Sequence, residues 1–544
     1  MRHGLNRRGM PGRGLPRRGF LGLAALPGPG LPHLARGAPE KSVAATEKSF
    51  VFVPQAMPAS LDPIATPSFA TRTAALAVFE TLYGIDARLN PMPQMVEQHR
   101  MEEDGKFWVF QLRPGLLFHD GSKVTARDCV ASLRRWMRRD RAGHALGARM
   151  DVIEAVDDLT LTLRLAKPQK QIPLMLTKSQ LSPPVIMPER FADTSTGTPV
   201  EKIIGSGPFR LANLAWRPGD DLDLIRFEQY EPRLDSSSFM GGRRVALVDR
   251  VLWRTKDDPV RALHDGLADW VEWLPPDPAG DGAAGGGVVV RTLDEIGNYA
   301  LLRFNTRRGP TANPRIRQAI LAGVDQVAVM EAVFGSNTSR FTAPAGLFPP
   351  ASEFYSGTGG DRTDAKQSPR AIKARLKAAG YNDEPIALIN PVDDMIHTRL
   401  TNAVIDELTQ IGLAVDERKL DGRAFEAWRR TADMPEGGDW SMFCDSLPAA
   451  DNFDGFAVSA GPAPSGGLWP GWPDDAVAAR LRDAWIDAAD LRGKRAISGQ
   501  LQEQVFTTAA FVPLGLWYPA TAWRSSLTGQ QKGPFPVFWD VARS

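Results

Sequence analysis

Alternation of apolar and polar residues marks several β-strands in the first half of the chain. Leu159–Leu165 reads LTLTLRL and follows the apolar segment Ile153–Val156 across a pair of aspartates, which predicts an antiparallel hairpin with one buried face. Phe107–Leu112 alternates in the same way, and Phe50–Val53 is a short apolar strand. This part of the chain is therefore predicted to be mainly antiparallel.

Helical spacing of apolar residues dominates the second half. Ile396–Ile411 carries Leu, Val, Leu and Ile on one face, and the apolar strands Ile386–Asn390 and Leu413–Val415 flank it. A strand, a helix and a strand at this spacing predict a βαβ unit, so a partly parallel sheet is expected here. Further helices are predicted at Ala70–Leu82, at Pro314–Phe334, at 369–379 and around Val477–Trp485.

The run 111–133, QLRPGLLFHDGSKVTARDCVASL, combines two tight turns with a helix start. Thr125 and Asp128 have the spacing of a capping box, in which each side chain satisfies a free backbone N–H at the start of a helix. Asp120 is expected to order the preceding turn, because a short carboxylate accepts hydrogen bonds from nearby backbone, and Gly121 supplies the unusual φ.

This run resembles the signature of the family 5 extracytoplasmic solute-binding proteins, the peptide, nickel and glutathione receptors of ABC importers. Other elements resemble the family in the same order along about 48–530: Leu61-Asp62-Pro63, the Gly-Ser-Gly-Pro-Phe element at 205–209, and the string beginning FNTRRGP at Phe304. The resemblance implies an α/β, two-lobed periplasmic binding protein fold. In this class the first lobe has an extra subdomain, and mixed sheets are joined by a two-segment hinge.

The resemblance also implies a division of the chain. Residues 1–45 form a leader, 46–300 plus 513–544 form lobe I, and 301–512 form lobe II, with an antiparallel subdomain at about 85–200 within lobe I. The hinge is expected at the strands Tyr299–Asn305 and Val512–Trp517.

The leader resembles an export signal. Arg17-Arg18 precede Gly-Phe-Leu, which is typical of a twin-arginine (Tat) signal, and cleavage is expected between about Ala35 and Thr46. No cysteine precedes Cys129, so a lipoprotein anchor is not expected and the protein is predicted to be periplasmic. Only Cys444 remains as a second cysteine, and two free thiols are predicted because the family layout places the two residues in different lobes.

Composition excludes several classes of function. The 544 residues carry a net charge of only +2, and the leader accounts for more than that, so nothing global favours nucleic acid. No apolar run approaches the length of a membrane span. The seven histidines form no zinc motif, and no Gly-x-Ser-x-Gly nucleophile elbow is present. The protein is therefore not expected to be an enzyme or to need a metal or other cofactor.

Candidate binding residues lie between 440 and 453. In peptide-binding relatives an aromatic residue precedes an Asp that receives the ligand's ammonium group, and a Pro-containing loop with Asp-Asn-Phe follows. Asp445 best matches that Asp, and Trp440 and Phe443 are the candidate aromatic walls. A buried carboxylate is costly unless a cation pairs with it, which is why an ammonium group would favour closure. An ordinary loop-capping Asp and a core tryptophan remain the alternatives.

The resemblance predicts a monomeric periplasmic receptor that binds a peptide between two lobes and delivers it to the membrane subunits of an ABC importer. Nickel chelate, glutathione or another small solute on the same fold is the alternative within this class. A periplasmic hydrolase is the alternative from a different class, and the absence of a visible nucleophile–base pair is its weakness.

Overall fold

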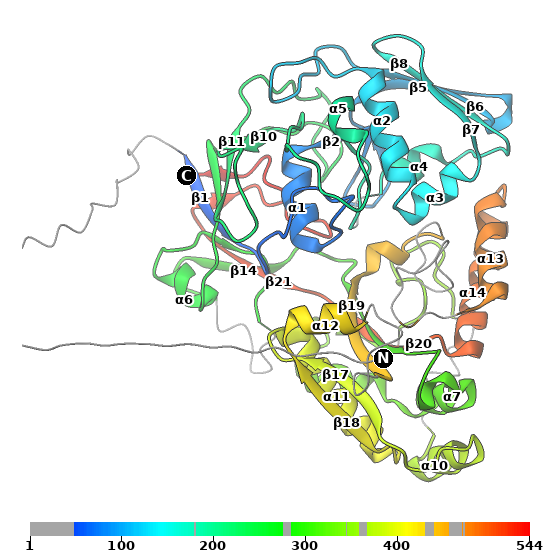
Figure 1. Ribbon diagram of the computed structural model, residues 1–544. Coiled ribbons are helices and arrows are strands. Elements are labelled where there is room, and N and C mark those ends of the chain that lie inside the picture. The colour runs from blue at the N-terminus through cyan, green and yellow to red at the C-terminus, as the bar shows by residue number, and fades with distance from the viewer. Residues whose placement is uncertain are drawn as a thin grey trace, which may run out of the picture. The chain divides into compact units, whose positions relative to one another are not determined.

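The computed structural model describes residues 48–178, 181–275, 284–343, 345–357, 367–429, 440–455, 471 and 474–544. The predicted leader, with its twin arginines, lies outside the described residues. The described part is α/β, as predicted, and its larger sheets have seven, six and four strands (Figure 1). Within it, no helix is both long and apolar enough to cross a membrane.

The seven-stranded sheet is mixed and is built around β1 (Ser49–Val53), the strand predicted at Phe50–Val53. β1 runs parallel to both of its neighbours, and its Phe52 is fully buried, with ring-centroid distances of 4.9 Å to Trp253 and 5.5 Å to Trp270. The order is β10 (Phe209–Leu211), β11 (Leu222–Arg226), β12 (Arg250–Trp253), β1, β13 (Trp270–Val271), β21 (Ala520–Arg524) and β14 (Val288–Thr292).

Helix α1 (Phe69–Val78) is shorter than predicted. The expected end at Leu82 is wrong, because the chain becomes extended at Phe79 and enters β2 (Glu80–Thr81) and β3 (Tyr83–Ile85). The Val78 carbonyl, which a continuing helix would bond to its own backbone, accepts a hydrogen bond from the Gly207 N–H at 2.8 Å. A Cβ at Gly205 would lie 2.1 Å from the same carbonyl oxygen, so the glycines of the 205–209 element permit this close approach.

The four-stranded sheet is antiparallel, in the order β5 (Val96–Glu102), β6 (Phe107–Leu112), β8 (Thr160–Leu165) and β7 (Met150–Ala155). The predicted hairpin is thereby confirmed. Helix α2 (Ala126–Met137) packs on this sheet, and Asp128 Oδ2 accepts from both the backbone N and the Oγ1 of Thr125 at 2.8 Å, which confirms the capping box. The short helices nearby are α3 (Arg141–Gly147), α4 (Ile172–Leu176) and α5 (Glu189–Ala192).

The six-stranded sheet contains the predicted βαβ unit. β17 (Ile386–Pro391) and β18 (Val415–Leu420) are parallel, and α11 (Met395–Gln410) connects them (Figure 1). The second strand lies further along the chain than its predicted range, Leu413–Val415, and shares only Val415 with it. The order is β16 (Phe341–Thr342), β20 (Phe511–Trp517), β15 (Asn298–Phe304), β19 (Met442–Pro448), β17 and β18.

The single helix predicted at Pro314–Phe334 is wrong, because two helices occupy this segment. α7 (Pro314–Gly323) ends before Val324, which is extended, and α8 (Gln326–Phe334) begins after Asp325. The Asp325 side chain accepts hydrogen bonds from the backbone N–H groups of Val327 and Ala328, so it caps the second helix and separates it from the first.

The chain passes between the two larger sheets at two places. It leaves the seven-stranded sheet after β14 and enters the six-stranded sheet at β15, and it returns between β20 and β21. The lobe boundaries predicted from the sequence remain a prediction.

The remaining elements are short or lie outside the larger sheets. The other helices are α6 (Pro259–His264), α10 (Pro369–Ala378), α12 (Gly422–Arg429), α13 (Ala476–Asp487) and α14 (Leu491–Thr508). The other strand pairs are β2 with β9 (Val185–Ile186), β3 with β4 (Pro91–Pro93) and β22 (Leu527–Thr528) with β23 (Ala542–Arg543).

Both cysteines are buried and free, as predicted. Cys129 lies on α2, and Cys444 lies on β19 in the six-stranded sheet. Burial raises the pKa of the Cys444 thiol to about 12 and raises that of Cys129 as well, so both thiols stay protonated at neutral pH.

Candidate ligand-binding site

Trp440 and Phe443 pack together beside the central strands of the six-stranded sheet. Their ring centroids are 5.2 Å apart, and Phe425 of α12 lies 5.7 Å from Phe443. Trp440 is 1% exposed and Phe443 is 0% exposed, in a small apolar cluster that also contains Ile389. In the described conformation these two candidate wall residues are core residues, and their contact with a solute remains a prediction.

Asp445 is held by charges of the protein itself. Arg303 of β15 donates from Nε to Asp445 Oδ2 at 2.5 Å, and both side chains are almost fully buried. Arg429 Nη1 lies 3.5 Å and His397 Nε2 lies 3.8 Å from the other carboxylate oxygen, Oδ1. Burial alone would raise the pKa of Asp445, but the positive charges of Arg303, His397 and Arg429 outweigh it and hold the pKa well below its usual range.

The same cluster perturbs His397. Its Nδ1 lies 2.9 Å from Asp394 Oδ2, and its ring faces Asp445 on the other side. Burial lowers the pKa of His397, but the two flanking carboxylates, Asp394 and Asp445, outweigh burial and raise it to about 9. His397 therefore contributes a third positive charge beside Asp445 at neutral pH, and a role of Asp445 as ammonium anchor stays a prediction.

A second polar cluster surrounds Arg72 on α1. Arg72 is 2% exposed, and its guanidinium lies over the Phe535 ring with its central carbon 4.1 Å from the ring centroid. Its hydrogen bond to a side chain among the described residues is a long one, from Nη2 to Thr73 Oγ1 at 3.4 Å, and its buried Nε has no partner there. Burial lowers the pKa of Arg72 to about 10, and the charges of Glu272, Asp451 and Asp294 oppose that effect.

Three carboxylates from separate segments face this guanidinium. Glu272 accepts a hydrogen bond from the Gln55 N–H at 3.0 Å, and Asp294 Oδ1 accepts from the N–H groups of Ile296 and Gly297 at 3.0 and 2.8 Å. Asp451, in the 3₁₀ turn η3 (Ala449–Asn452), has a buried Oδ1 with no hydrogen-bond partner among the described residues. Burial raises the pKa of Asp294 and of Asp451 to about 6 and raises that of Glu272.

Aromatic rings line the same region. Trp273 lies edge to face with Phe69 at 5.5 Å and with Trp517 at 5.2 Å, and Trp517 stacks on Phe334 at 5.7 Å. Two of the three acids, Glu272 and Asp294, line a pocket next to these rings. The other lining residues are Trp270, Trp273, Leu293, Pro519, Thr521, Gly533, Pro534, Phe535 and Pro536. Apolar walls with a few convergent polar groups are typical of small-molecule sites.

Comparison with known proteins identifies the family. Residues 90–460 match the bacterial extracellular solute-binding proteins, family 5 Middle, which covers well over half of the chain. The chain belongs to this family. Among family 5 relatives, it is 30% identical over 494 residues to the "Probable peptide ABC transporter periplasmic-binding protein y4tO" of Sinorhizobium fredii, covering 89% of this chain and 91% of the relative.

Solved structures agree on the family 5 fold. The periplasmic binding protein AgaA of A. tumefaciens R10, in complex with agropinic acid, has a TM-score of 0.74 at 22% identity and covers 91% of this chain and 99% of its own. The oligopeptide-binding protein AppA of Bacillus subtilis, in complex with a nonapeptide, has a TM-score of 0.76 at 16% identity and covers 92% and 99%. The chain therefore has the two-lobed periplasmic binding protein fold, as the sequence predicted.

The signature run of this family 5 chain has a structural role. His119 Nε2 and Gly207 O lie 3.0 Å apart, His119 Nδ1 accepts from the Gly205 N–H at 3.3 Å, and burial lowers the pKa of the ring to about 4. Asp120 Oδ1 accepts from the backbone N–H and hydroxyl of Ser122, which confirms its predicted role in the turn. The neutral imidazole thus ties the signature turn to the glycine element that ends α1.

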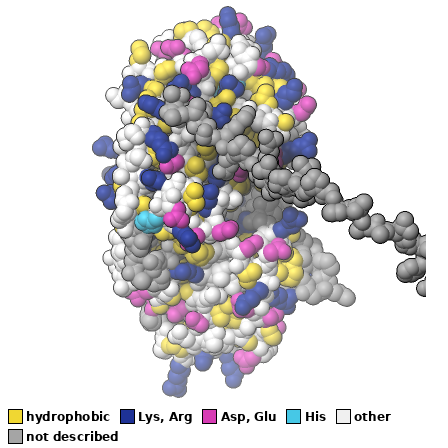
Figure 2. All heavy atoms as spheres, turned by 90° about the vertical axis from the view of Figure 1, so that its left-hand side faces the viewer, with side chains coloured by type: hydrophobic (Ala, Val, Ile, Leu, Met, Phe, Trp, Pro, Cys, Tyr) yellow, Lys and Arg dark blue, Asp and Glu magenta, His cyan; other side chains and the backbone are white. Residues whose placement is uncertain are grey.

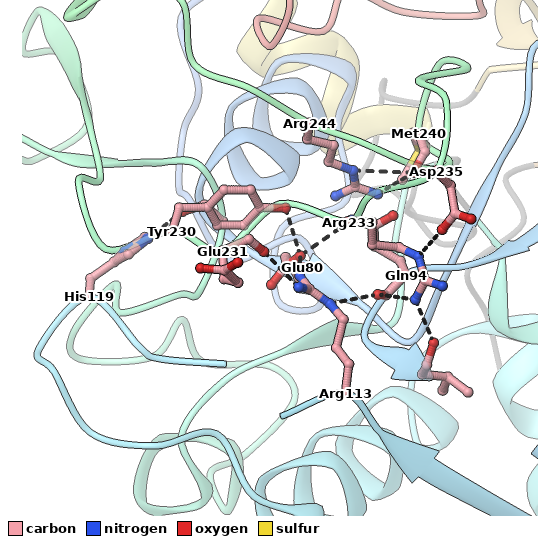
Figure 3. A network of polar contacts seen from close by, with 12 residues as sticks. Glu80, Gln94, Arg113, His119, Tyr230, Glu231, Arg233, Asp235, Met240 and Arg244 are labelled. Atoms are coloured by element: carbon pink, nitrogen blue, oxygen red, sulfur yellow. Dashed lines mark hydrogen bonds and ion pairs between the residues drawn. The ribbon is translucent and has the colours of Figure 1, made fainter. Parts of the chain in front are cut away.

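A buried network next to this turn fixes Glu80 (Figure 3). Tyr230 donates its hydroxyl to Glu80 Oε1 at 2.9 Å, and Arg113 Nη2 lies 3.4 Å from the same oxygen. Arg113 also donates to the Glu231 carbonyl at 2.6 Å, and Arg244 donates to the Met240 carbonyl. A single buried carboxylate with these partners joins β2, the end of β6 and the 230–244 segment, so this network belongs to the scaffold.

Sequence reasoning missed Arg72, Glu272, Asp294 and Asp451 as a group. Asp451 belongs to the Asp-Asn-Phe of the candidate loop, but no local pattern links it to an arginine on α1. Trp273 and Trp517 were also missed, although Trp517 ends a strand predicted to form the hinge. Proximity of segments this far apart in the chain can be read only from the fold.

Proposed function

We propose that this protein is the solute receptor of an ABC-type importer in the periplasm. It captures its solute between two lobes and presents the closed form to the importer's membrane subunits, so the solute acts by stabilising the closed population. The observation that carries the proposal is the similarity to the peptide-binding relative y4tO over nearly the whole of both chains.

Peptides are the proposed solute class. A cleft that pairs with peptide backbone groups and leaves wet, roomy side-chain pockets can accept many sequences. A nickel chelate, glutathione or an opine-like solute on the same fold is the second candidate, since the similarity to the agropinic acid complex shows the same fold. The protein is proposed to act by capture and release, without making or breaking covalent bonds.

Native mass spectrometry of gently purified protein tests the assignment first, because a closed cleft retains cargo. A tryptophan-fluorescence titration with mixed di- to pentapeptides then measures binding, and the expected result is a saturable change in emission. A flat titration with peptides alongside saturation with another solute would reject the peptide assignment and leave the receptor assignment in place. Turnover of peptides or glycans by pure protein would favour the hydrolase alternative.

The export route and oligomeric state belong to the same proposal. Arg17 and Arg18 are proposed to direct the chain through the twin-arginine route, as a soluble monomer without a lipid anchor. Replacement of both arginines by lysine should leave the protein in the cytoplasmic fraction, whereas replacement of Arg7 and Arg8 should not. Light scattering coupled to size-exclusion chromatography measures the mass of the exported form.

The lobes are proposed to meet at the two crossings between the larger sheets. Lobe I would contain 46–300 plus 513–544, and lobe II 301–512, as expected from the sequence. The position of β14 and β21 in one sheet and of β15 and β20 in the other supports this division.

A further inference from the structure

The charges around Asp445 and around Arg72 are balanced in opposite ways. Asp445 is a single carboxylate facing the cations Arg303, Arg429 and His397. Around Arg72, three buried or half-buried carboxylates face one guanidinium. An added cation would therefore meet repulsion beside Asp445 and attraction in the Arg72 cluster.

Other groups near Asp451 do not reverse this balance. The acid also faces Lys178 and Arg141, which are cationic, and Asp140, which is anionic. Lys178 Nζ lies 2.6 Å from Asp140 Oδ2, so these two charges largely cancel. Arg141 in turn lies near Arg482 and Arg303, so the excess of negative charge is confined to Arg72 and the three acids that act on it.

The arginine and the acids do not close on each other. Within the part of the chain that the structure describes, Arg72 forms no ion pair with Glu272, Asp294 or Asp451, although all three acids act on its pKa. Buried opposite charges of one protein normally pair directly, because solvent no longer screens them. Here Arg72, which is 2% exposed, has a buried Nε with no hydrogen-bond partner among the described residues. Asp451 has a buried Oδ1 in the same condition, and Glu272 and Asp294 line a pocket.

We propose that this cluster, and not Asp445, receives the solute, through a protonated amine bound by Asp451 and Asp294 and an adjacent carbonyl or carboxylate oxygen bound by Arg72. The first residue of a peptide and a free amino acid both present this pair of groups. The amine supplies the missing positive charge, and the oxygen accepts hydrogen bonds from the buried guanidinium. Trp273 and Phe535 line the pocket together with Glu272 and Asp294, and Phe535 also carries the Arg72 guanidinium on its ring. This inference rests on the proposed receptor function.

Isothermal titration calorimetry with chemically matched probes tests the proposal. The probes are a mixture of di- and tripeptides, the same mixture N-acetylated, and a mixture of free amino acids. Wild-type protein should bind at least one of the two free-amine probes, and acetylation should weaken peptide binding by about tenfold or more, since it removes the cation. Which free-amine probe binds distinguishes a peptide terminus from an amino acid.

Variants locate the site. Asp451→Asn and Asp294→Asn should each weaken binding by about tenfold or more, and Arg72→Met should do the same through the neighbouring oxygen. The exposed Asp193→Asn is the matched control and should bind as wild type does. Glu272→Gln provides a second acidic variant if one of the others fails to fold, as judged by circular dichroism.

The outcomes separate the inference from the function on which it rests. Binding of free-amine probes that is unchanged by acetylation and by the Asp451 and Asp294 variants overturns the inference and leaves the receptor function standing. If folded Asp445→Asn protein loses binding and Asp451→Asn protein keeps it, the amine is bound by Asp445 and the inference is wrong. If wild-type protein binds neither free-amine probe but does bind another solute, the receptor function stands and this inference fails; if it binds no solute at all, both fail.

Discussion

At the scale of single residues, the chain contains two clusters of buried charge with different consequences. The Arg303–Asp445 pair is direct, and the attraction between the two charges offsets the free-energy cost of removing both from water. Arg72 has no such pair among the described carboxylates. Loss of Asp445 should therefore affect mainly folding, and loss of the acids near Arg72 should affect mainly binding.

Asp445→Ala is expected to lower the free energy of unfolding by about 3–5 kcal/mol, because it leaves Arg303 buried without its carboxylate. Urea denaturation followed by tryptophan fluorescence measures the change. Asp416→Ala is the control: it removes a half-exposed ion pair with Arg418 and should cost at most about 1 kcal/mol. A folded Asp445→Ala protein of nearly wild-type stability that no longer binds solute would show instead that Asp445 is a binding residue.

His397 should make stability depend on pH in the alkaline direction. Its pKa is raised from 6.5 to about 9 in the folded protein, so its contribution is fully present below about pH 6.5 and is lost as the pH rises to about 9. The stability difference between wild type and His397→Gln should accordingly shrink over that interval. The comparison isolates His397 from Lys494, whose lowered pKa acts in the opposite sense. A difference that is constant from about pH 6 to 9 would contradict the prediction.

At the scale of elements, helix ends determine how neighbouring segments are joined. α1 ends where the Gly207 N–H of the 205–209 element donates to its last carbonyl, that of Val78. α2 begins at a capping box whose acid, Asp128, also reaches a third segment. Asp128 Oδ1 accepts from the Glu189 N–H at 2.8 Å, so the same carboxylate caps α2 and holds α5. A carboxylate that caps one helix and also holds a second should contribute more to the free energy of unfolding than an ordinary cap.

Asp128→Ala is expected to destabilise the protein by about 1–3 kcal/mol, more than Thr125→Ala, because it removes the cap and leaves the partly buried N–H of Glu189 without its acceptor. Thermal and urea denaturation measure both variants. Asp151→Ala, at an exposed position of β7, should stay within about 0.5 kcal/mol of wild type. Equal effects at Asp128 and Thr125 would assign Asp128 to the capping box alone.

Local patterns could be predicted from the sequence, and non-local contacts could not. The capping box, the hairpin and the βαβ unit each depend on residues a few positions apart, so their side-chain spacing is visible in the chain. The break at Val324 was missed because apolar spacing continues across it and only the capping by Asp325 reveals it. Arg303 and Asp445 are 142 positions apart, and no periodicity connects a strand arginine to an acid at that separation.

At the scale of the whole molecule, contacts between segments far apart in the sequence could stabilise the proposed closed form. Asp487 at the end of α13 accepts from Arg149 Nη2 at 2.6 Å and lies 3.6 Å from Lys167 Nζ, and Gln169 donates to the Ile486 carbonyl. Arg149 and Lys167 flank strands of the four-stranded sheet, whereas α13 packs on α14.

On the face shown in Figure 2, acidic and basic side chains are interspersed. Electrostatic steering of a charged solute by one large patch is therefore not expected on this face.

Asp487→Ala should weaken solute binding by about two- to fivefold, because an ion pair that is partly exposed contributes up to about 1 kcal/mol to the closed form. Calorimetry measures the affinity, and small-angle scattering with and without solute measures the change in radius of gyration. Asp483→Ala on the same helix is the control. Unchanged affinity and scattering in Asp487→Ala would show that this contact does not bias closure.

The unbonded thiols at Cys129 and Cys444 make maturation independent of oxidants. Dithiothreitol should not alter the melting temperature, and material produced in a reducing host should match material recovered from outside the inner membrane. A polypeptide with two free thiols can fold completely in a reducing compartment, as the proposed twin-arginine route would require.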